Sequence, residues 1–535
     1  MKNKYLKLLL LATITSFTAC EGLLDLTPED AVSKDAFFQT TNDFELAITG
    51  LYSELRPLDP DALGGAYAGN LYWEVCADAM FYKFSWTNPW YDISRGKLYP
   101  NTDRLDAIWG NLYQTINWAN TIIEALDKNA SLLSADFAKE VRGQAHFVRA
   151  ICYIRLTSLW GAVPMISRVL APADAKQPRT DVNELTTKLI IPDLEIAITN
   201  LNEKPYSGKW GRATKQAAMG MKVRALLYNK DYKSTVAAAQ ELMTLAAGSK
   251  YIDFLPEYEK IFANDNENNP EILFSLKYTA GGFKQGSTFN TPFGGKVPGL
   301  PTSSMNGSWE SITLTPEYID SYPMTDGLAS TQSSVFDAQN PWKNRGPRFE
   351  STYYIAGIST VNGLPFEAKM VASISKDMIK DYPMNLDKGY MNESVKSDWI
   401  QEDESDFILL RYTDVLMMYA EAKTELNEID NSVYDILDQV RDRASIARVK
   451  RGQSQTEMRQ TIQDERKWEF AYEGLRYFDI RRWGIAEKVI NAIKSDEKYD
   501  FGSTKLFIAP NHYLWPLPQR AIDVNPNLLP NNPGY

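Results

Sequence analysis

Cysteine and histidine are scarce in this 535-residue chain, which contains three cysteines and two histidines. Beyond Cys20, only Cys76 and Cys152 remain. Two thiols form at most one bridge, so disulfides are not what holds this chain together. A chain of this length can bury a large apolar core, and we predict two buried thiols, with a single disulfide as the alternative. His146 and His512 lie far apart in sequence, and neither is accompanied by a nucleophile motif.

The chain also lacks an excess of basic residues. It has 57 Lys and Arg against 68 Asp and Glu, which gives a net charge of −11. Without the three lysines of the first seven residues the charge is −14. An acidic surface repels phosphate backbones, and no basic run with interleaved aromatic residues is found, so we predict no nucleic-acid partner.

Long apolar runs are missing as well. The run Leu8–Ala12 follows a lysine-containing start, continues weakly to Phe17, and is well short of the ~20 residues of a membrane-spanning helix. With the small residues before Cys20, this pattern predicts a secretory signal over residues 1–19. We further predict a lipoprotein signal in which Cys20 becomes the acylated first residue. Phe17 departs from the leucine usual there, and an ordinary signal peptide cut near a chance cysteine is the alternative.

Aromatic residues, in contrast, are abundant. They make up 12% of the chain and include 29 Tyr and 13 Trp. Tyrosine and tryptophan combine a flat apolar face with a polar edge. This composition suits the binding of neutral, hydroxyl-rich ligands as well as the packing of helices.

Apolar residues recur every three or four positions in several segments, which predicts amphipathic helices. The predicted helices cover about 108–126, 141–159, 214–228, 232–246, 412–426, 433–444 and 458–472, with a further stretch towards Trp483. The short link 229–231 predicts an antiparallel helix pair. Helix pairs of about 34 residues are the unit of tetratricopeptide-like arrays. The predicted fold is therefore mainly α: a tetratricopeptide-like helical-repeat scaffold, or α-α superhelix, that carries a large irregular region.

Two irregular stretches interrupt the helical pattern. Residues 281–307 contain seven glycines, and the chain stays rich in Ser, Asn, Pro and Tyr up to about residue 406. A second irregular stretch covers residues 81–103, and the proline-punctuated end from Asn511 is expected to lie as an extended tail over other structure. Loops on a rigid scaffold commonly carry binding residues, so we expect the binding surface there.

Seven sequence motifs, in order over nearly the whole chain, resemble the SusD/RagB family of surface glycan-capture lipoproteins. They are "CEGLLDLTPED", "IWGNLYQTINWANTIIEAL", "EVRGQAHFVRAICYIRLTSLWGAVPMI", "LTPEYIDSYPMTDG" with "NRGPRF", "LLRYTDVLMMYAEAKTEL", "DERKWEFAYEGLRYFDIRRWG" and "YLWPLPQ…NPNLLPNNPGY". Gly143 and Gln144 are unusual inside the third. The corresponding division is a signal peptide at 1–19, a SusD-like N-terminal helical region at 20–250, and a RagB/SusD C-terminal region at 267–535. The last region is loop-rich over 281–406, helical over 407–494 and extended over 511–535.

The resemblance implies a function and a set of partners. It implies an outward-facing outer-membrane lipoprotein, not an enzyme, that binds oligosaccharides or polysaccharides. Such a protein covers a SusC-like TonB-dependent transporter and delivers the glycan to it, while its N-terminal lipid is its only contact with the membrane.

The resemblance also points to aromatic residues outside the helical stripes as glycan-binding candidates. In this family the stretch before the first long helix and a later loop contribute to the binding platform. The candidates are Trp86, Asn88, Trp90 and Tyr91 in the first stretch, Trp309 in the second, and, more weakly, Phe283 and Phe289 among the glycines. The alternative is that these rings pin the loops to the scaffold. Tyr72 and Trp73 are expected to be buried.

Other conspicuous residues are predicted to be structural. Arg476 and Asp479 have the three-residue spacing of a helical ion pair, and Asp464, Glu465 and Arg466 are interpreted as ion-pairing residues too. Five tryptophans within or beside apolar stripes are expected in the core: Trp109, Trp118, Trp160, Trp468 and Trp483.

Three other functions remain open at this stage. Part of the family is associated with oligopeptide uptake, and an acidic groove would suit basic peptides. A glycoside hydrolase needs only two carboxylates about 5–10 Å apart, although no motif supports such a pair. A helical-repeat scaffold that binds other proteins is the third. We predict no cofactor: calcium is compatible with the family, but no aspartate-rich loop of recognised spacing predicts it, and the metal question stays open.

Overall fold

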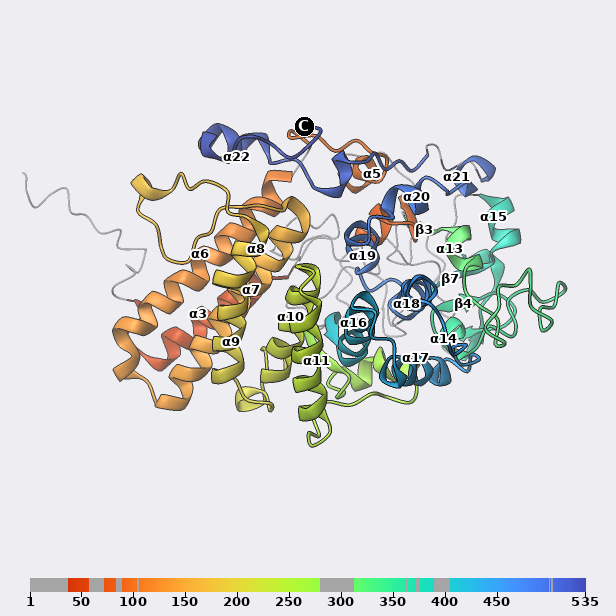
Figure 1. Ribbon diagram of the computed structural model, residues 1–535, viewed down its shortest axis with the longest axis horizontal. Helices are drawn as coiled ribbons and strands as arrows, with labels where there is room; N and C mark the ends of the chain where they lie inside the picture. Colours follow the sequence, from red (N-terminus) through yellow and green to blue (C-terminus); the bar gives the residue numbers. More distant parts are fainter. Residues whose placement is uncertain are drawn as a thin grey trace, which may run out of the picture.

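The computed structural model describes residues 37–56, 72–82, 89–102, 105–279, 312–361, 363–371, 375–388, 405–499, 501 and 504–535. Helices dominate this part of the chain (Figure 1). The helices of the N-terminal half lie on the left in that view, those of the C-terminal half in the middle, and most of the short strands on the right. The predicted mainly α fold is confirmed.

The N-terminal half consists of long helices packed side by side. They are α3 (Thr41–Ser53), α6 (Leu105–Asn129), α7 (Ala135–Trp160), α8 (Val182–Leu185), α9 (Ile191–Asn200), α10 (Lys215–Tyr228) and α11 (Tyr232–Ala246). Helix α7 begins where the Ser134 hydroxyl accepts a hydrogen bond from the Phe137 N–H, and it ends at Gly161, whose φ of 71° favours glycine. Because α7 packs against α3, α6 and α9, it is buried on nearly all sides.

The C-terminal half continues the same stack. Its helices are α16 (Tyr412–Glu425), α17 (Asn431–Arg443), α18 (Gln455–Glu469), α19 (Arg476–Arg482), α20 (Ala486–Ile490) and α21 (Ser495–Lys498). Helix α11 packs against both α10 and α16, and α16 then packs against α17 and α18. The two helical segments, separated by 165 residues of sequence, thus form one continuous array, as expected for a helical-repeat scaffold.

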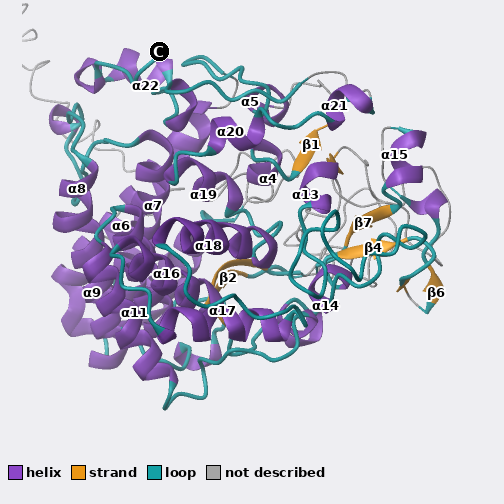
Figure 2. Cartoon of the chain, turned by 45° about the vertical axis from the view of Figure 1, so that its right-hand side comes forward, coloured by secondary structure: helices purple, strands orange, loops and turns teal. Residues whose placement is uncertain are grey.

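Most of the short strands lie to the right of the long helices in Figure 2. Four two-stranded antiparallel ladders pair β1 (Met80–Tyr82) with β3 (Ile312–Leu314), β2 (Ile272–Leu276) with β8 (Phe407–Arg411), β4 (Tyr353–Ile355) with β7 (Met384–Leu386), and β5 (Thr360–Val361) with β6 (Leu364–Pro365). The short helices are α4 (Tyr72–Cys76), α5 (Pro89–Ile93), α13 (Pro316–Asp320), α14 (Pro347–Glu350), α15 (Lys376–Asp381) and α22 (Gln519–Val524). Two of these ladders, β1–β3 and β2–β8, join segments that are distant in sequence.

The C-terminal tail lies across the ends of the N-terminal helices, at the top of Figure 1. The indole N–H of Trp160 donates to the Pro516 carbonyl over 2.8 Å, and the Trp515 N–H donates to the Leu159 carbonyl over 2.8 Å. The Asn532 amide donates to the carbonyls of Trp160 and Trp515. These bonds hold the tail against the end of α7, and the tail includes the short helix α22.

Trp118 corrects one expectation about the core. Trp109, Trp160 and Trp468 are buried as predicted, and Trp483 is half-buried, but the Trp118 side chain is 46% exposed. The buried residues Ile108, Leu112 and Ile116 lie on the inward face of α6. Trp118 follows Ile116 by two positions, which places it on the outer face together with the exposed Asn117.

Cys76 and Cys152 are both buried and unbridged, which confirms the predicted buried thiols. Burial raises the pKa of Cys76 to about 12, so this thiol stays protonated and unreactive at neutral pH. None of the described helices is both long enough and apolar enough to cross a bilayer.

Candidate functional site

The β1–β3 ladder brings together the two segments in which binding residues were predicted. Its register pairs Tyr82 with Ile312, and the two strands are antiparallel. The segment after Tyr82 and the segment before Ile312 therefore depart from the same end of the ladder, although about 230 residues separate them. Trp86, Asn88, Phe283, Phe289 and Trp309 belong to these segments and lie outside the described residues, as does Cys20.

Trp90 does not offer an exposed ring, which corrects its place among the candidates. Its side chain is fully buried. It stacks on Tyr72 with ring centroids 5.6 Å apart and meets the edge of Trp73 at 4.9 Å. Trp90 therefore holds α5 against α4 and the core, which is the structural alternative given above for the candidate rings.

Tyr91 is half-buried and one of its faces is already covered. The Arg95 guanidinium carbon lies 3.7 Å from the centroid of the Tyr91 ring. Arg95 also donates to the carbonyls of Tyr82 and Tyr91 over 3.1 and 3.2 Å. Arg95 thus ties the end of β1 to α5, and any ligand contact by Tyr91 would use its edge or hydroxyl.

A column of tryptophans supports this end of the molecule, and the predicted burial of Tyr72 and Trp73 is confirmed. Trp73 and Trp515 have centroids 5.4 Å apart, Trp515 and Trp160 are 5.7 Å apart, and Trp160 and Trp109 are 5.1 Å apart. Large rings in contact restrict one another and contribute more than their buried area alone. The column connects α4 and α5 to the C-terminal tail and to α6 and α7.

Buried charged side chains also bind the segment that contains α4. The Lys505 ammonium, which has almost no exposed surface, donates to the carbonyls of Val75 and Ala77. Burial lowers the pKa of Lys505 to about 7. Arg476 donates to both oxygens of Asp78 over 2.8 and 2.9 Å. Although burial by itself raises the pKa of Asp78, Arg476 outweighs it and holds the pKa well below its ordinary value.

Glu74 is a buried carboxyl group with an incomplete set of partners. Its Oε1 accepts a hydrogen bond from the Gly474 N–H over 2.7 Å, and its Oε2 has no partner among the described residues. Burial raises its pKa from the ordinary 4.5 to about 8. Glu74 is therefore largely protonated at neutral pH.

We expect Glu74→Gln to change how stability depends on pH. Between about pH 5 and 8 the folded protein keeps a proton that the unfolded chain releases, so wild-type stability falls as pH rises through this window. A glutamine has no proton to release. The stability difference between variant and wild type should shift in favour of the variant by about 1 kcal/mol per pH unit. Urea unfolding at several pH values measures this, with Glu350→Gln, at an exposed position, as the control. Identical pH profiles for Glu74→Gln and wild type would contradict it.

Arg476, Asp479 and Arg482 of the "EGLRYFDIRRWG" motif form structural ion pairs, whereas Arg481 donates to backbone carbonyls. One predicted partner is wrong. Arg476 pairs with Asp78 and not with Asp479. Asp479 instead pairs with Arg466 over 2.9 Å and with Arg482 over 2.8 Å. Helical spacing permitted the predicted pair, but the tertiary fold brings closer partners. For the nearby acidic residues, Glu465 pairs with Arg348 and Arg441, and Asp464 accepts from Gln460.

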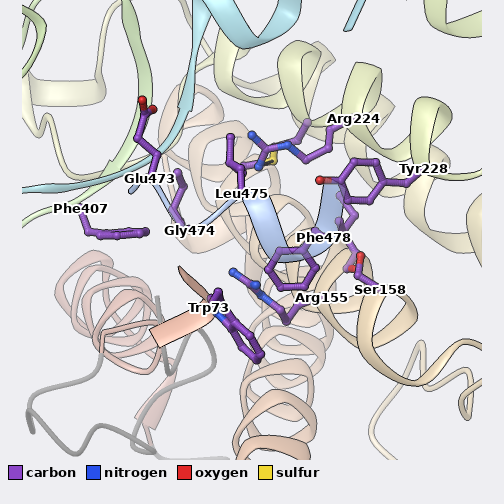
Figure 3. A pocket seen from close by; sticks show the side chains of 13 residues that line it. Trp73, Arg155, Ser158, Arg224, Tyr228, Phe407, Glu473, Gly474, Leu475 and Phe478 are labelled. Carbon is purple, nitrogen blue, oxygen red and sulfur yellow. Dashed lines mark hydrogen bonds between the residues drawn. The ribbon is translucent and has the colours of Figure 1, made fainter. Parts of the chain in front are cut away.

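A cavity between α7, α10, α19 and β8 lies close to this motif (Figure 3). Trp73, Arg155, Arg224, Phe478 and Glu473 are among its lining residues. Its volume is about 40 Å³, whereas ligand pockets usually measure about 300–1,000 Å³. The cavity has room for one or two water molecules and not for a sugar ring.

A larger groove was missed by sequence reasoning. It has a volume of about 550 Å³ and lies between α6, the loop that follows α7, and α22. Trp109 and Tyr113 contribute its aromatic wall, and Arg520 pairs with Asp106 across 3.4 Å at its edge. The only sequence feature that could have indicated this groove is Trp109. It was assigned to the core because aromatic residues in an apolar helical stripe usually pack there.

The described residues contain no group of three or more His, Cys, Asp or Glu side chains that could hold a metal ion. Acidic side chains described above, such as Asp78, Asp479 and Glu465, instead pair with arginines. His146 lies 2.6 Å from Asp193, which also pairs with Arg149 over 2.7 Å.

Known protein families match both halves of the chain. The SusD family matches residues 270–535, and a family described as starch-binding and associating with the outer membrane matches residues 29–227. SusD-like protein P25 of Formosa agariphila is 26% identical to this chain, and the alignment covers 98% of each protein.

Solved structures show the same fold. A SusD-like carbohydrate-binding protein from Bacteroides fragilis has a TM-score of 0.78 at 24% identity, covering 92% of this chain and 100% of that one. Surface glycan-binding protein A from Bacteroides thetaiotaomicron, in complex with laminarihexaose, has a TM-score of 0.69 at 18% identity, covering 92% and 99%. Together with the two family matches, these similarities show that the chain belongs to the SusD/RagB family.

Proposed function

We propose that this protein is a non-catalytic glycan-binding lipoprotein of the outer membrane. In this proposal Cys20 carries the lipid anchor, the protein faces outward, and it passes oligosaccharide to a SusC-like TonB-dependent transporter. The observation that carries the proposal is the pairing of Tyr82 with Ile312. Because of this pairing, the segment that contains Trp86 and the segment that contains Trp309 both start from the same end of a short ladder. The glycan-binding relatives support the choice of ligand.

Chain geometry limits how far the two principal candidates can lie from each other. Trp86 is four residues beyond Tyr82, and Trp309 is three residues before Ile312. An extended chain spans at most about 3.6 Å per residue, so both rings are attached within roughly 15 Å of the same strand end. A flat ring covers the C–H face of a sugar while amides and carboxylates bond its hydroxyl groups.

The expected affinity is low. An aromatic contact adds about 0.5–1.5 kcal/mol beyond its buried area. Two or three such contacts with a few hydrogen bonds, after the cost of association, leave roughly −4 to −6 kcal/mol, or a Kd of about millimolar to tens of micromolar. Weak binding suits a protein that must release its ligand to a transporter.

We expect the double variant Trp86→Ala/Trp309→Ala to lose measurable glycan binding and to keep its fold. Isothermal titration calorimetry with laminarihexaose, the ligand of one structural neighbour, and then with a panel of other oligosaccharides, measures this. Trp118→Ala is the matched control, because it removes an exposed tryptophan from α6. If the double variant bound a glycan as tightly as wild type does, the assignment of Trp86 and Trp309 to the binding platform would be wrong.

Peptide capture is the second candidate, and the net charge of −11 favours it. A negatively charged protein attracts lysine- and arginine-rich peptides, whereas neutral oligosaccharides are indifferent to charge. Titration of a basic oligopeptide beside the oligosaccharide panel separates the two. Salt-sensitive peptide binding without any glycan binding would favour the second candidate.

The absence of catalysis is part of the proposal. The buried, protonated carboxyl of Glu74 resembles a general acid in its pKa, but Glu74 belongs to α4 and its side chain has no exposed surface. Prolonged incubation with oligosaccharide should therefore release no new reducing ends.

A further inference from the structure

We propose that a pocket centred on Trp210 and Gln216 is a second sugar-binding site, which takes a single sugar residue. This site is additional to the aromatic platform proposed above and shares only the class of ligand with it. Its described walls come from the loop between α9 and α10, the start of α10, the linker after α11, and β2. They do not come from α4, α5, β1 or β3.

The size of the pocket suits one ring. Its volume is about 170 Å³, which is below the range of about 300–1,000 Å³ for drug-sized ligands. The lining residues that the proposal uses are Pro205, Trp210, Gln216, Lys250, Tyr251 and Asn268. One sugar residue would fill the pocket, and the rest of a glycan chain would continue into solvent.

Gln216 supplies the main reason to expect a ligand. Its side chain is only 5% exposed, and its amide nitrogen donates to the Glu203 carbonyl over 2.9 Å. Its Oε1 is buried and accepts no hydrogen bond from any described residue. A buried acceptor without a donor is unfavourable, and a donor brought by a ligand would satisfy it.

Trp210 supplies a ring face at the same pocket. Its side chain is 45% exposed, which is unusual for a residue with so large an apolar surface. The loop that carries it is tightly folded: Ser207 and Gly208 have φ of 51° and 73°, and the Trp210 N–H donates to the Gly208 carbonyl over 3.2 Å. The ring is therefore presented from a defined turn rather than from an extended loop.

Ion pairs and hydrogen bonds hold the walls in place. Arg212 pairs with Glu45 of α3, and Lys277 of the β2 end pairs with Asp406. On the other wall, the Ser249 hydroxyl donates to Glu203 over 2.7 Å and accepts from the Tyr251 N–H over 3.1 Å. Such contacts give a preformed pocket, which lowers the cost of binding.

The charged residues around the pocket favour a ligand hydroxyl over a ligand ammonium as the hydrogen-bond donor to Gln216 Oε1. Three cationic side chains line it, and Arg212 and Lys277 are paired as described. The ammonium of Lys250 lies 5.3 Å from the Tyr251 ring centroid, and no ion pair joins it to a described carboxylate. Glu267 also lines the pocket, so its lining has three cationic side chains and one carboxylate. This excess of cations disfavours an ammonium donor. A sugar brings neutral hydroxyl donors and a C–H face for Trp210, so it meets both requirements.

The test uses the full-length protein and a panel of methyl pyranosides, including a methyl glucuronoside because Lys250 would favour an acidic ring. The readout is the indole N–H resonance of Trp210, assigned by its loss in Trp210→Ala. We expect at least one sugar of the panel to shift this resonance in wild type. We expect Gln216→Met to weaken that binding at least tenfold. Trp210→Phe keeps a ring face but has no indole resonance, so its affinity is measured by isothermal titration calorimetry with the same sugar, and we expect it to retain most of the binding. Trp118→Ala, the matched exposed tryptophan, should leave it unchanged.

The same titration in the Trp86→Ala/Trp309→Ala background separates this inference from the proposed function. Persistence of the Trp210 shift in that background supports the second site whether or not the platform is correct. If no sugar shifts the Trp210 resonance while the platform binds glycan, the second site is wrong and the platform stands. A shift unaffected by Gln216→Met in a correctly folded variant would also overturn the proposal, because the unpaired amide oxygen is its basis.

Discussion

Glu469→Gln is expected to lower the free energy of unfolding by about 3–5 kcal/mol, the usual result of removing one partner from a buried charge network. Glu469 has no exposed surface. Its carboxylate is within 2.9 Å of guanidinium nitrogens of Arg348 and Arg411 and within 2.7 Å of one of Arg443. Burial alone would raise the pKa of Glu469, but the three arginines, Arg443 foremost, hold it far below its ordinary value.

The size of this effect follows from the balance of charge inside the network. Glu271, Glu465 and Glu473 also contact these arginines, with distances of 2.7–2.9 Å. A glutamine keeps the volume of Glu469 but removes its negative charge, so Arg348, Arg411 and Arg443 each lose one of their charged partners while they stay buried. The network joins α14, α17, α18, β2 and β8, and its loss should reduce the cooperativity of the C-terminal half as well as its stability.

Urea unfolding followed by circular dichroism measures the change. The control is Asp442→Asn, which removes a carboxylate from an ion pair with Arg448 of similar length, 2.6 Å, in which both side chains are largely exposed. Exposed pairs contribute about 0–1 kcal/mol, so this variant should remain close to wild type. Equal effects of the two variants would show that burial does not decide the strength of these pairs.

Trp515→Ala is expected to destabilise the protein by about 3–5 kcal/mol, as usual when a buried tryptophan is truncated. The ring is fully buried between Trp73, Trp90 and Trp160, and its indole N–H donates to the Tyr477 hydroxyl over 2.9 Å. Alanine would leave a cavity in the centre of the tryptophan column and an unsatisfied hydroxyl group.

This variant should also weaken glycan binding, because Trp73 and Trp90 hold α4 and α5 beneath the proposed platform. Thermal unfolding and calorimetric titration of the same sample measure the two effects. Val524→Ala is the matched control: it lies on the same C-terminal tail but is 65% exposed, and surface substitutions usually change stability by less than about 0.5 kcal/mol. Full stability of Trp515→Ala would mean that the tail does not complete the core.

Local patterns predicted the helical scaffold well. The apolar stripes around Ile116, Val148 and Leu416 identified α6, α7 and α16, and the three-residue link 229–231 correctly indicated the pairing of α10 with α11. These inferences succeeded because helical periodicity is a property of neighbouring residues. The tail was expected to be extended because its prolines disfavour regular structure, but it contains the short helix α22, which begins directly after Pro518.

Side-chain environments were predicted less well. Trp118 was expected in the core and is exposed, because a difference of one or two helical positions rotates a side chain from the inner to the outer face. Trp90 was expected to be accessible and is buried, because its environment is supplied by Trp73 and by Trp515, more than 400 residues away. Arg476 pairs with Asp78, which is likewise distant in sequence and is brought close only by the tertiary fold.

The sequence by itself determined the presence and order of the long helices and most of their inward-facing positions, since these depend on contacts within a few residues. Only the tertiary structure decided which distant segments meet: Tyr82 with Ile312, Trp73 with Trp515, and the loop of Trp210 with the linker that carries Tyr251. The physical reason is that many pairings of apolar or charged residues are chemically equivalent in sequence. Packing of the whole chain selects one of them by burying the most surface with the fewest unpaired polar groups.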